Sequence, residues 1–362
     1  MLRSFLIFLL SVGLILVLCL PAVWWILPKS SLPQSSSSTS SSRIHPTEQQ
    51  PQSSTSLPSQ SASSPDESSL PMMTFSLYDE GTGERLTLSA RDYVRGALAS
   101  EMPPTFHPEA LKAQAVACHT YAMYVALAER NANTKDASLH GADFKVDTVK
   151  REGYVTEEIA KSRYGEENAD AWWQIICDAA DAVYDEILTY EAEPIVAVYH
   201  AISPGITERA SAVWLTDLPY LVPVVSDGDL IAPGYESTAT FTQKQVKNKL
   251  TTIGANSFSK DPSEWFSDFS RSESGTILSV DAAGTVTDGP SLRTLFGLRS
   301  ACFEIDYDAA SSSFTFTCHG YGHGVGLSQY GAEGLAQEGK TYKEILAHYY
   351  PGTVLTKVVD AS

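Results

Sequence analysis

Glu101 lies in the first of two stretches whose residue types could carry out chemistry, RDYVRGALASEMPPTFHPEALKAQAVACHTYAMY at residues 91–124. Tyr93, Ala97 and Glu101 are four residues apart and share one stripe of a predicted helix. Glu101 would lie at the edge of the buried face and in the last turn, and both partial burial and the negative helix end raise a carboxyl pKa. An acid kept protonated near neutral pH can cleave a glycosidic bond. The alternative is a solvated glutamate at a helix end.

Gln114 lies on the helix predicted next, on one face with Ala110, Ala117 and Tyr121. It interrupts an otherwise apolar stripe, and a buried amide needs hydrogen-bond partners. We expect Gln114 to support the site by orienting Glu101 or a sugar; a structural hydrogen bond to a loop is the alternative.

The second stretch, HGYGHGVGLSQYGAEGLAQEGKTYKEILAHYYPGT at residues 319–353, is rich in glycine. Glycines at alternate positions from 320 to 326 allow positive φ or a close approach of the backbone to a ligand. Four side chains that follow are of the polar and aromatic kinds that bind sugars: His323, Ser328, Gln329 and Tyr330. The stretch is therefore a candidate substrate-binding segment.

Three histidines of this segment, His319, His323 and His348, raise the question of a metal site. Only Cys318 joins them at a usual ligand spacing, so we predict no metal there and no other cofactor. A phosphate-binding loop is also unsuitable, because the terminal Gly-Lys-Ser/Thr is missing.

Cys302 and Cys318 lie in two alternating runs joined by a turn-like Ala-Ala-Ser-Ser-Ser segment. In the hairpin that this pattern predicts, the two positions come within about two residues of register. A disulfide would form if this region lies outside the cytoplasm. Two small buried residues that stay reduced are the alternative.

Composition and charge limit the partners of the chain. The net charge is −18, and the excess lies beyond residue 72, because the charges before it cancel. Such an acidic surface argues against nucleic acid and against anionic lipid as a broad binding partner. A neutral sugar polymer remains suitable.

The N-terminal part predicts a membrane anchor followed by a tether. Residues 4–28 form 25 uncharged, mostly apolar residues, against the roughly 20 that a transmembrane helix needs. We therefore assign 1–28 to a transmembrane anchor, with a cleaved signal peptide as the alternative. Residues 29–72 are rich in Ser, Pro and Gln and predict a disordered linker.

From residue 73 to 358 the pattern is globular, with predicted helices and strands in mixed order. Strands are expected at 73–78 and 85–89 and near 187–201, 220–226, 276–281 and 301–318, and helices at 90–102, 109–131, within 164–182 and at 341–350. This order predicts an α+β fold with antiparallel strands that forms one grooved catalytic region.

Several motifs together resemble the stage II sporulation protein D family, which includes LytB-like amidase enhancers. They are Glu101-Met102-Pro103, EALKAQAVA at 109–117, GHGVGLSQYGA at 322–332, HYYPGT at 348–353, and HAISPGITERAS at 200–211, which matches a Ser-x-Gly-x-Thr-Glu pattern. The resemblance runs from about residue 74 to 353 and adds Ser203, Thr207 and Tyr350 to the candidate substrate-binding residues.

The resemblance implies a lytic transglycosylase, a lyase of glycan strands. Such enzymes cut between N-acetylmuramic acid and N-acetylglucosamine, preferably on strands stripped of stem peptides, and leave 1,6-anhydro ends. The family's catalytic glutamate falls on Glu101, and the 6-hydroxyl of the sugar attacks, so no second carboxylate is needed. His119 replaces the arginine usual in the family, so its contact with substrate would depend on pH. Some relatives carry a zinc cluster; here the matching stretch offers only His140, so no zinc is expected.

The resemblance also implies a setting. It points to cell-wall degradation in sporulation, during engulfment of the forespore, with a membrane-anchored catalytic domain outside the cytoplasm in the septal space. The implied partners are peptidoglycan strands, an amidase or endopeptidase, and a polytopic membrane protein. The alternative function is a non-catalytic, glycan-binding enhancer of a partner amidase.

Overall fold

The computed structural model describes residues 70–214 and 216–359. The predicted anchor at 1–28, and the predicted linker as far as residue 69, lie outside the described residues. Within the described part, no helix is both long and apolar enough to cross a bilayer.

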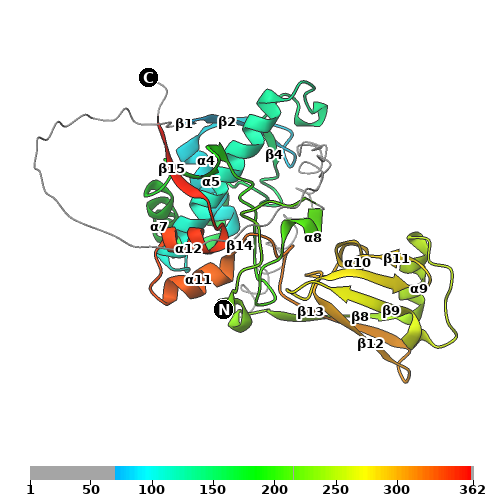
Figure 1. The fold of residues 1–362 in the computed structure, drawn as a ribbon. Helices are drawn as coiled ribbons and strands as arrows, with labels where there is room; N and C mark the ends of the chain where they lie inside the picture. Colours follow the sequence, from blue (N-terminus) through cyan, green and yellow to red (C-terminus); the bar gives the residue numbers. More distant parts are fainter. Residues whose placement is uncertain (1–69, 215, 360–362) are drawn as a thin grey trace, which may run out of the picture.

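The larger of two lobes is built around α4 (Ala90–Glu101) and the long α5 (Pro108–Asn131). Ser89 caps α4 through a hydrogen bond from Asp92 N, and Pro108 occupies the first turn of α5. A small sheet of β3 (Arg85–Ser89), β2 (Thr74–Asp79) and β4 (Phe144–Val146) lies at one end of these helices (Figure 1). The helices at 90–102 and 109–131 and the strands at 73–78 and 85–89 are therefore confirmed to within one residue at each end.

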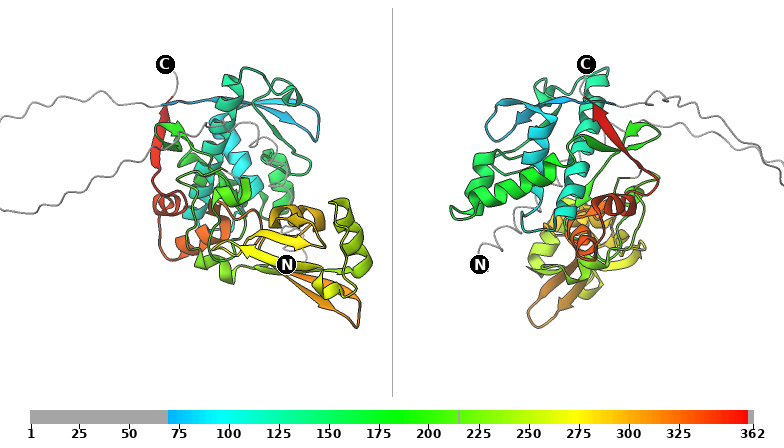
Figure 2. Two further views of the ribbon diagram at one scale, coloured as in Figure 1. Left: turned by 45° about the vertical axis from the view of Figure 1, so that its right-hand side comes forward. Right: turned by 90° about the vertical axis from the view of Figure 1, so that its left-hand side faces the viewer.

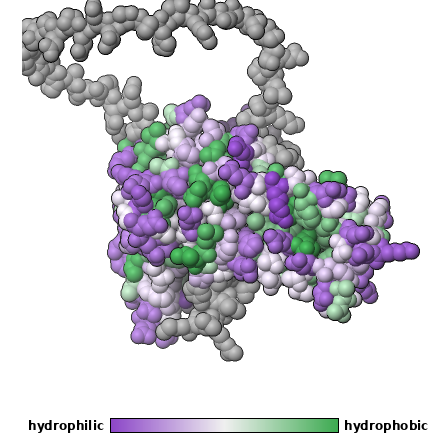
Figure 3. Space-filling model, turned by 60° about the horizontal axis from the view of Figure 1, so that its bottom comes forward, coloured by the Kyte–Doolittle hydropathy of each residue, from purple (hydrophilic) through white to green (hydrophobic). Residues whose placement is uncertain are grey.

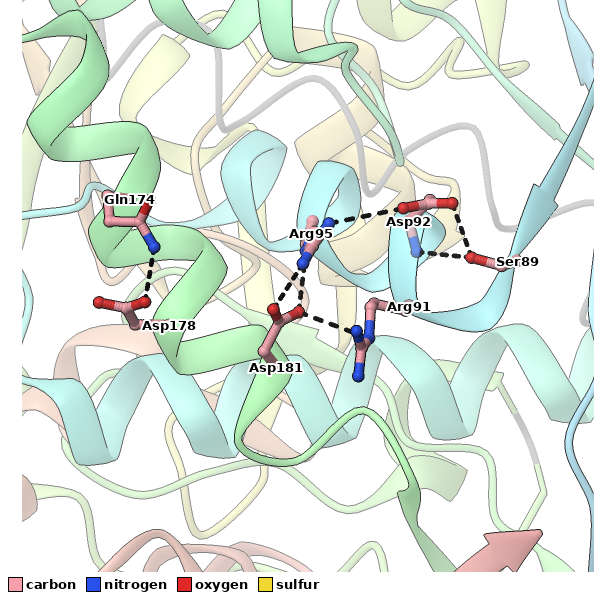
Figure 4. Close-up of polar contacts among 7 residues, drawn as sticks. All are labelled: Ser89, Arg91, Asp92, Arg95, Gln174, Asp178 and Asp181. Carbon is pink, nitrogen blue, oxygen red and sulfur yellow. Dashed lines mark hydrogen bonds and ion pairs between the residues drawn. The ribbon is translucent and has the colours of Figure 1, made fainter. Parts of the chain in front are cut away.

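The packing of α4 against α7 (Ala169–Asp181) fixes the helix that carries Glu101. Arg95 donates from Nε and Nη2 to the two carboxylate oxygens of Asp181, and Arg91 adds a looser ion pair of 3.9 Å (Figure 4). Such a paired geometry holds a guanidinium in one orientation. Arg95, nearly two turns before Glu101, is thus the side chain that holds this part of α4, and the exposed, looser pair of Arg91 adds little.

The remaining elements of this lobe surround α5. They are β1 (Leu70–Pro71), η1 (Ala137–Leu139), α6 (Glu157–Tyr164), β5 (Glu186–Tyr190), β6 (Glu193–Pro194), β7 (Tyr199–His200), α8 (Ala210–Trp214), η2 (Asp227–Ile231), β14 (Leu327–Ser328), α11 (Gln329–Gln337), α12 (Tyr342–Tyr349) and β15 (Val354–Val359). Most strand pairs are antiparallel, but β1–β15, β2–β4 and β7–β14 are parallel. The α+β prediction is confirmed, with these parallel pairs as an addition.

A second, smaller lobe lies to one side of the first and below it (Figures 1 and 2). Its two three-stranded sheets contain β8 (Glu236–Thr242), β12 (Phe303–Asp308) and β13 (Ser313–His319) in one, and β9 (Phe266–Arg271), β10 (Ile277–Ala282) and β11 (Val286–Thr287) in the other. With α9 (Gln243–Thr252), η3 (Pro262–Glu264) and α10 (Gly289–Phe296) they enclose a separate core that includes Phe303, Phe314 and Phe316. The globular region therefore consists of two lobes, each with its own core.

Two details of the predicted elements are wrong. The segment near 220–226 forms no strand; it makes only an isolated bridge between Ile206 and Val225. The hairpin of β12 and β13 exists, but it pairs Phe303 with Cys318 across the strands, and both lie in the core. Adjacent residues of an extended chain point to opposite faces, so Cys302 does not face Cys318. Both are free thiols in this structure, which corrects the disulfide.

The surface seen from below carries small hydrophobic patches separated by hydrophilic residues, over both lobes (Figure 3). Over the described residues visible in this view, the face presents no single broad apolar area of the kind that marks a large protein interface.

Candidate active site

Glu101 is the last residue of α4 and is buried, with 2% of its surface exposed. Burial removes water from the carboxylate and raises the pKa of Glu101 to about 7, while Gln329 and the Tyr199 hydroxyl oppose that effect. A carboxyl group with such a pKa is present in both protonation states near neutral pH. It can therefore act first as an acid and then as a base.

Gln329 provides the hydrogen bond to Glu101 that the structure shows. Its Nε2 donates to Glu101 Oε2 over 3.4 Å, and Glu101 Oε1 has no partner among the described residues. Gln329 is the first residue of α11, and Ser328 caps that helix by accepting from Gly331 N. One oxygen of the acid is thus held by Gln329, and the other lies buried without a partner in the described structure.

Tyr199, Cys118 and Gln114 form the wall beside Glu101. The Gln114 Nε2 lies 3.3 Å from Cys118 Sγ, and that sulfur lies 3.7 Å from the Tyr199 hydroxyl. Gln114 therefore reaches Glu101 through two intermediate side chains rather than directly. Its Oε1 is buried without a partner in the described structure.

Asp229 is a buried carboxylate that is not among the predicted site residues. It accepts from Ser203 N and Ser203 Oγ at 3.0 and 2.5 Å, and from Ser328 Oγ at 2.6 Å. Burial raises the pKa of Asp229 to about 6, against the effect of these hydrogen bonds. The two predicted serines thus share one acceptor. Two buried serines in separate motifs indicate that an acceptor is needed. They do not indicate which residue of the sequence provides it.

The glycine-rich segment lies directly against residues 198–203. A Cβ at Gly326 would come 2.1 Å from the Val198 carbonyl oxygen, and one at Gly320 would come 2.8 Å from that of Ile202. Both glycines have positive φ, as the spacing predicts. The glycines bring two parts of the backbone together, which lets β7 and β14 pair and so places Tyr199 near Gln329.

His323 and Tyr330 frame the same region. The Nδ1 atom of His323 accepts from Val325 N at 3.0 Å, its ring lies 4.9 Å from that of Trp214, and its buried Nε2 has no partner in the described part. Burial lowers the pKa of His323 well below its usual value, so the ring is neutral. Tyr330 is half-buried, with its ring 5.1 Å from Phe106.

Three predicted residues lie away from Glu101. His119 is fully buried against Phe75, at 6.0 Å between ring centroids, and burial lowers its pKa to about 4. Thr207 bonds the backbone of residues 222 and 224, and the Tyr350 hydroxyl donates to Val198 O at 2.7 Å. These three side chains are fully buried, and the contacts that the structure shows for them are with Phe75 and with the backbone, so they support the fold.

Among residues 70–214 and 216–359, no three His, Cys, Asp or Glu side chains converge as ligands for a metal ion. His319 instead faces Glu236 at 3.4 Å, and His348 bonds the Val225 carbonyl oxygen.

The sequence of the chain is similar to those of several known proteins. A family model described as "Stage II sporulation protein" (SpoIID) matches residues 78–190, which include Glu101 and Gln114. The chain is 35% identical over 268 residues to stage II sporulation protein D of Bacillus subtilis, covering 74% of each protein. It is 35% identical over 266 residues to the protein of the same name from Bacillus amyloliquefaciens, again covering 74% of each. An amidase enhancer of Bacillus subtilis is 28% identical over 73% of this chain and 40% of its own length.

Proposed function

The chain belongs to the stage II sporulation protein D family, and from this membership and the state of Glu101 we propose that it is a lytic transglycosylase of the sporulating cell wall. The observation that supports the activity most directly is a buried carboxyl with a pKa of about 7, one oxygen of which is free of partners among the described residues. That is the group which protonation of a glycosidic oxygen requires.

The proposed reaction uses Glu101 twice. In its acid form Glu101 gives its proton to the glycosidic oxygen, and the bond from that oxygen to C1 of N-acetylmuramic acid breaks. The carboxylate then takes the proton of the muramic 6-hydroxyl as O6 bonds to C1, which closes the 1,6-anhydro ring. No water is consumed and Glu101 ends protonated, so one carboxyl completes the cycle.

Asp229 and Glu152 are two further buried carboxylates with raised pKa values, and the bonding of Asp229 argues against a second catalytic role for it. Both of its oxygens accept hydrogen bonds from serines. A nucleophile or base needs a free oxygen directed at the substrate. This argues against Asp229 as a second catalytic carboxylate.

The setting belongs to the same proposal. The chain would act from a membrane anchor at 1–28 through the linker 29–72, outside the cytoplasm in the septal space, during engulfment of the forespore. The proposed partners are a peptidoglycan amidase or endopeptidase, which removes stem peptides first, and a polytopic membrane protein. The amidase enhancer among the relatives supports a link to amidases.

The test is product analysis. Purified chain is incubated with glycan strands freed of stem peptides, and the products are identified by mass spectrometry. We expect 1,6-anhydro-muramic ends from the native chain. Glu101→Gln, which keeps the size and polarity of the side chain, should lower the rate by about a hundredfold or more.

The similarity to an amidase enhancer favours a second candidate, a glycan-binding protein that stimulates an amidase without cutting glycan itself. In that case neither the native chain nor Glu101→Gln would release anhydro ends, and both would accelerate a purified amidase equally. Anhydro ends that depend on Glu101 rule this candidate out.

A further inference from the structure

Arg299 carries a guanidinium group that the fold leaves without an acceptor. Its Nε and Nη2 atoms are buried and have no hydrogen-bond partner in the described part of the chain. The group stacks on the ring of Tyr321, with Cζ 3.9 Å from the ring centroid. Stacking fixes the plane of the guanidinium but uses none of its N–H donors.

No carboxylate of residues 70–214 and 216–359 pairs with Arg299 or with the neighbouring Arg293, which is only 9% exposed. Burial lowers the pKa of both guanidinium groups. The positive charges of both lower the pKa of the Tyr321 phenol, against the stronger effect of burial. This is unexpected in a chain of net charge −18. Arg293 Nε donates to the Leu298 carbonyl oxygen at 3.4 Å, so Arg299 is the one of the two whose buried donors stay unpaired in the described structure. Buried N–H donors cost free energy unless an acceptor arrives, which makes Arg299 a candidate site for an anion.

The position of Arg299 connects it to Glu101. The Arg299 carbonyl oxygen accepts from Gly322 N at 3.0 Å, in the glycine-rich segment. The charge of Arg299 also lowers the pKa of the phenol of Tyr330, the residue that follows Gln329, against the stronger effect of burial. Tyr330 packs on the apolar cluster that contains Tyr321. Arg299 is therefore linked through Tyr330 to the start of α11, where Gln329 bonds Glu101.

We infer that Arg299, stacked on Tyr321, binds the free lactyl carboxylate of muramic acid in glycan strands that have lost their stem peptides; this rests on the proposed function. In intact wall the lactyl group is bound to a peptide through an amide and carries no charge there. Removal of the peptide leaves a carboxylate on the sugar whose bond Glu101 would break. A planar fork of donors is suited to bind it.

This assignment gives a physical reason for substrate choice. A strand that keeps its peptides offers Arg299 a neutral amide with a bulky substituent, so the buried donors stay unpaired. A stripped strand pairs them. Discrimination of this kind arises from the cost of leaving a charged group without its partner.

The experiment compares stripped strands with the same strands after their carboxylates are converted to primary amides by carbodiimide and ammonia. KM and kcat for release of anhydro ends are measured for the native chain, Arg299→Gln, Arg299→Lys and Arg91→Gln. Arg91 is the matched control: it also stacks on a tyrosine, 4.2 Å from the Tyr184 centroid, but pairs with Asp181. Thermal unfolding of each variant checks that it folds.

We expect the native chain and Arg91→Gln to show a KM about tenfold or more lower for the carboxylate strands, with similar kcat. Arg299→Gln should lose this preference and cut both substrates as the native chain cuts the amide form. Arg299→Lys, which keeps the charge without the fork, should retain part of it and serves in place of Arg299→Gln if that variant is unfolded. A native chain that treats both strands alike, or an Arg299 variant that weakens both equally, would overturn the inference.

Binding separates this inference from the proposed activity. In the Glu101→Gln background, calorimetry with carboxylate and amide strands measures recognition without cleavage. A preference for carboxylate that disappears in Glu101→Gln/Arg299→Gln supports the site even if the native chain releases no anhydro ends. Equal binding of both strands rejects the site even if cleavage is observed.

Discussion

Gln329 and Glu101 are 228 positions apart in the sequence, yet Gln329 Nε2 lies 3.4 Å from Glu101 Oε2. The contact joins the end of α4 to the start of α11, and thus the two stretches in which the sequence gathers its chemistry. A donor on one carboxylate oxygen lowers the pKa of the acid, against the stronger effect of burial. The balance between the two places the pKa of Glu101 near neutrality.

Removing the charge of Glu101 should stabilise the protein at high pH. The pKa of Glu101 is about 7 in the fold, above its ordinary value of 4.5, so the stability it contributes is present below about pH 4.5 and is lost as pH rises through 7. Glu101→Gln should therefore match the native chain near pH 4 and exceed it by about 3 kcal/mol near pH 8. Urea unfolding of both proteins at the two pH values measures this; an equal difference at both would contradict it.

Gln329→Leu should move the pH dependence of activity. Without its hydrogen bond the pKa of Glu101 rises further, so the alkaline limb of the pH–rate profile should move to higher pH. Gln337→Leu is the matched control, because Gln337 lies on the same helix and bonds Glu333 instead. A Gln329→Leu profile that coincides with that of the control would show that this contact does not tune the acid.

Asp229→Ala should destabilise the larger lobe. The change leaves the Ser203 hydroxyl and N–H without their acceptor in a buried place and leaves the Ser328 hydroxyl only its 3.3 Å bond to the Ala201 carbonyl oxygen, at a cost of roughly 3 kcal/mol. Asp227→Ala, an exposed position two residues earlier, should change the free energy of unfolding little. Denaturant unfolding compares the two; similar values would mean that the serines find other acceptors.

Gly326→Ala tests the close approach that pairs β7 with β14. A Cβ there would collide with the Val198 carbonyl oxygen and would also require φ of +74° from alanine. Gly339→Ala is the control, because Gly339 has φ of +90° but nothing within 4 Å of its Cβ position. We expect a clearly larger fall in the unfolding midpoint for Gly326→Ala, together with loss of activity as Tyr199 moves from Glu101. Equal effects of the two substitutions would show that only backbone strain matters, and that the close contact with the Val198 carbonyl oxygen does not.

The sequence by itself determined the local structure around the acid. Ser89, Pro108 and the spacing of apolar residues set the bounds of two helices, since caps and periodicity act over a few residues. The same local signals placed Glu101 in a last turn, and the glycines of residues 320–326 allowed the positive φ that all four adopt. Short, contiguous motifs also allowed the family resemblance to be recognised from the sequence.

The tertiary structure alone decided which of these residues meet. The role of Asp229 depends on serines 26 and 99 positions away in the sequence. Arg299 has unpaired donors because the folded structure brings no acceptor to them among the described residues. His119 follows Cys118 by one residue, but on a helix that step turns the side chain by about 100°, away from Glu101 and into the core against Phe75. Burial and pKa arise from contacts between distant segments, and no local pattern in a single sequence specifies them.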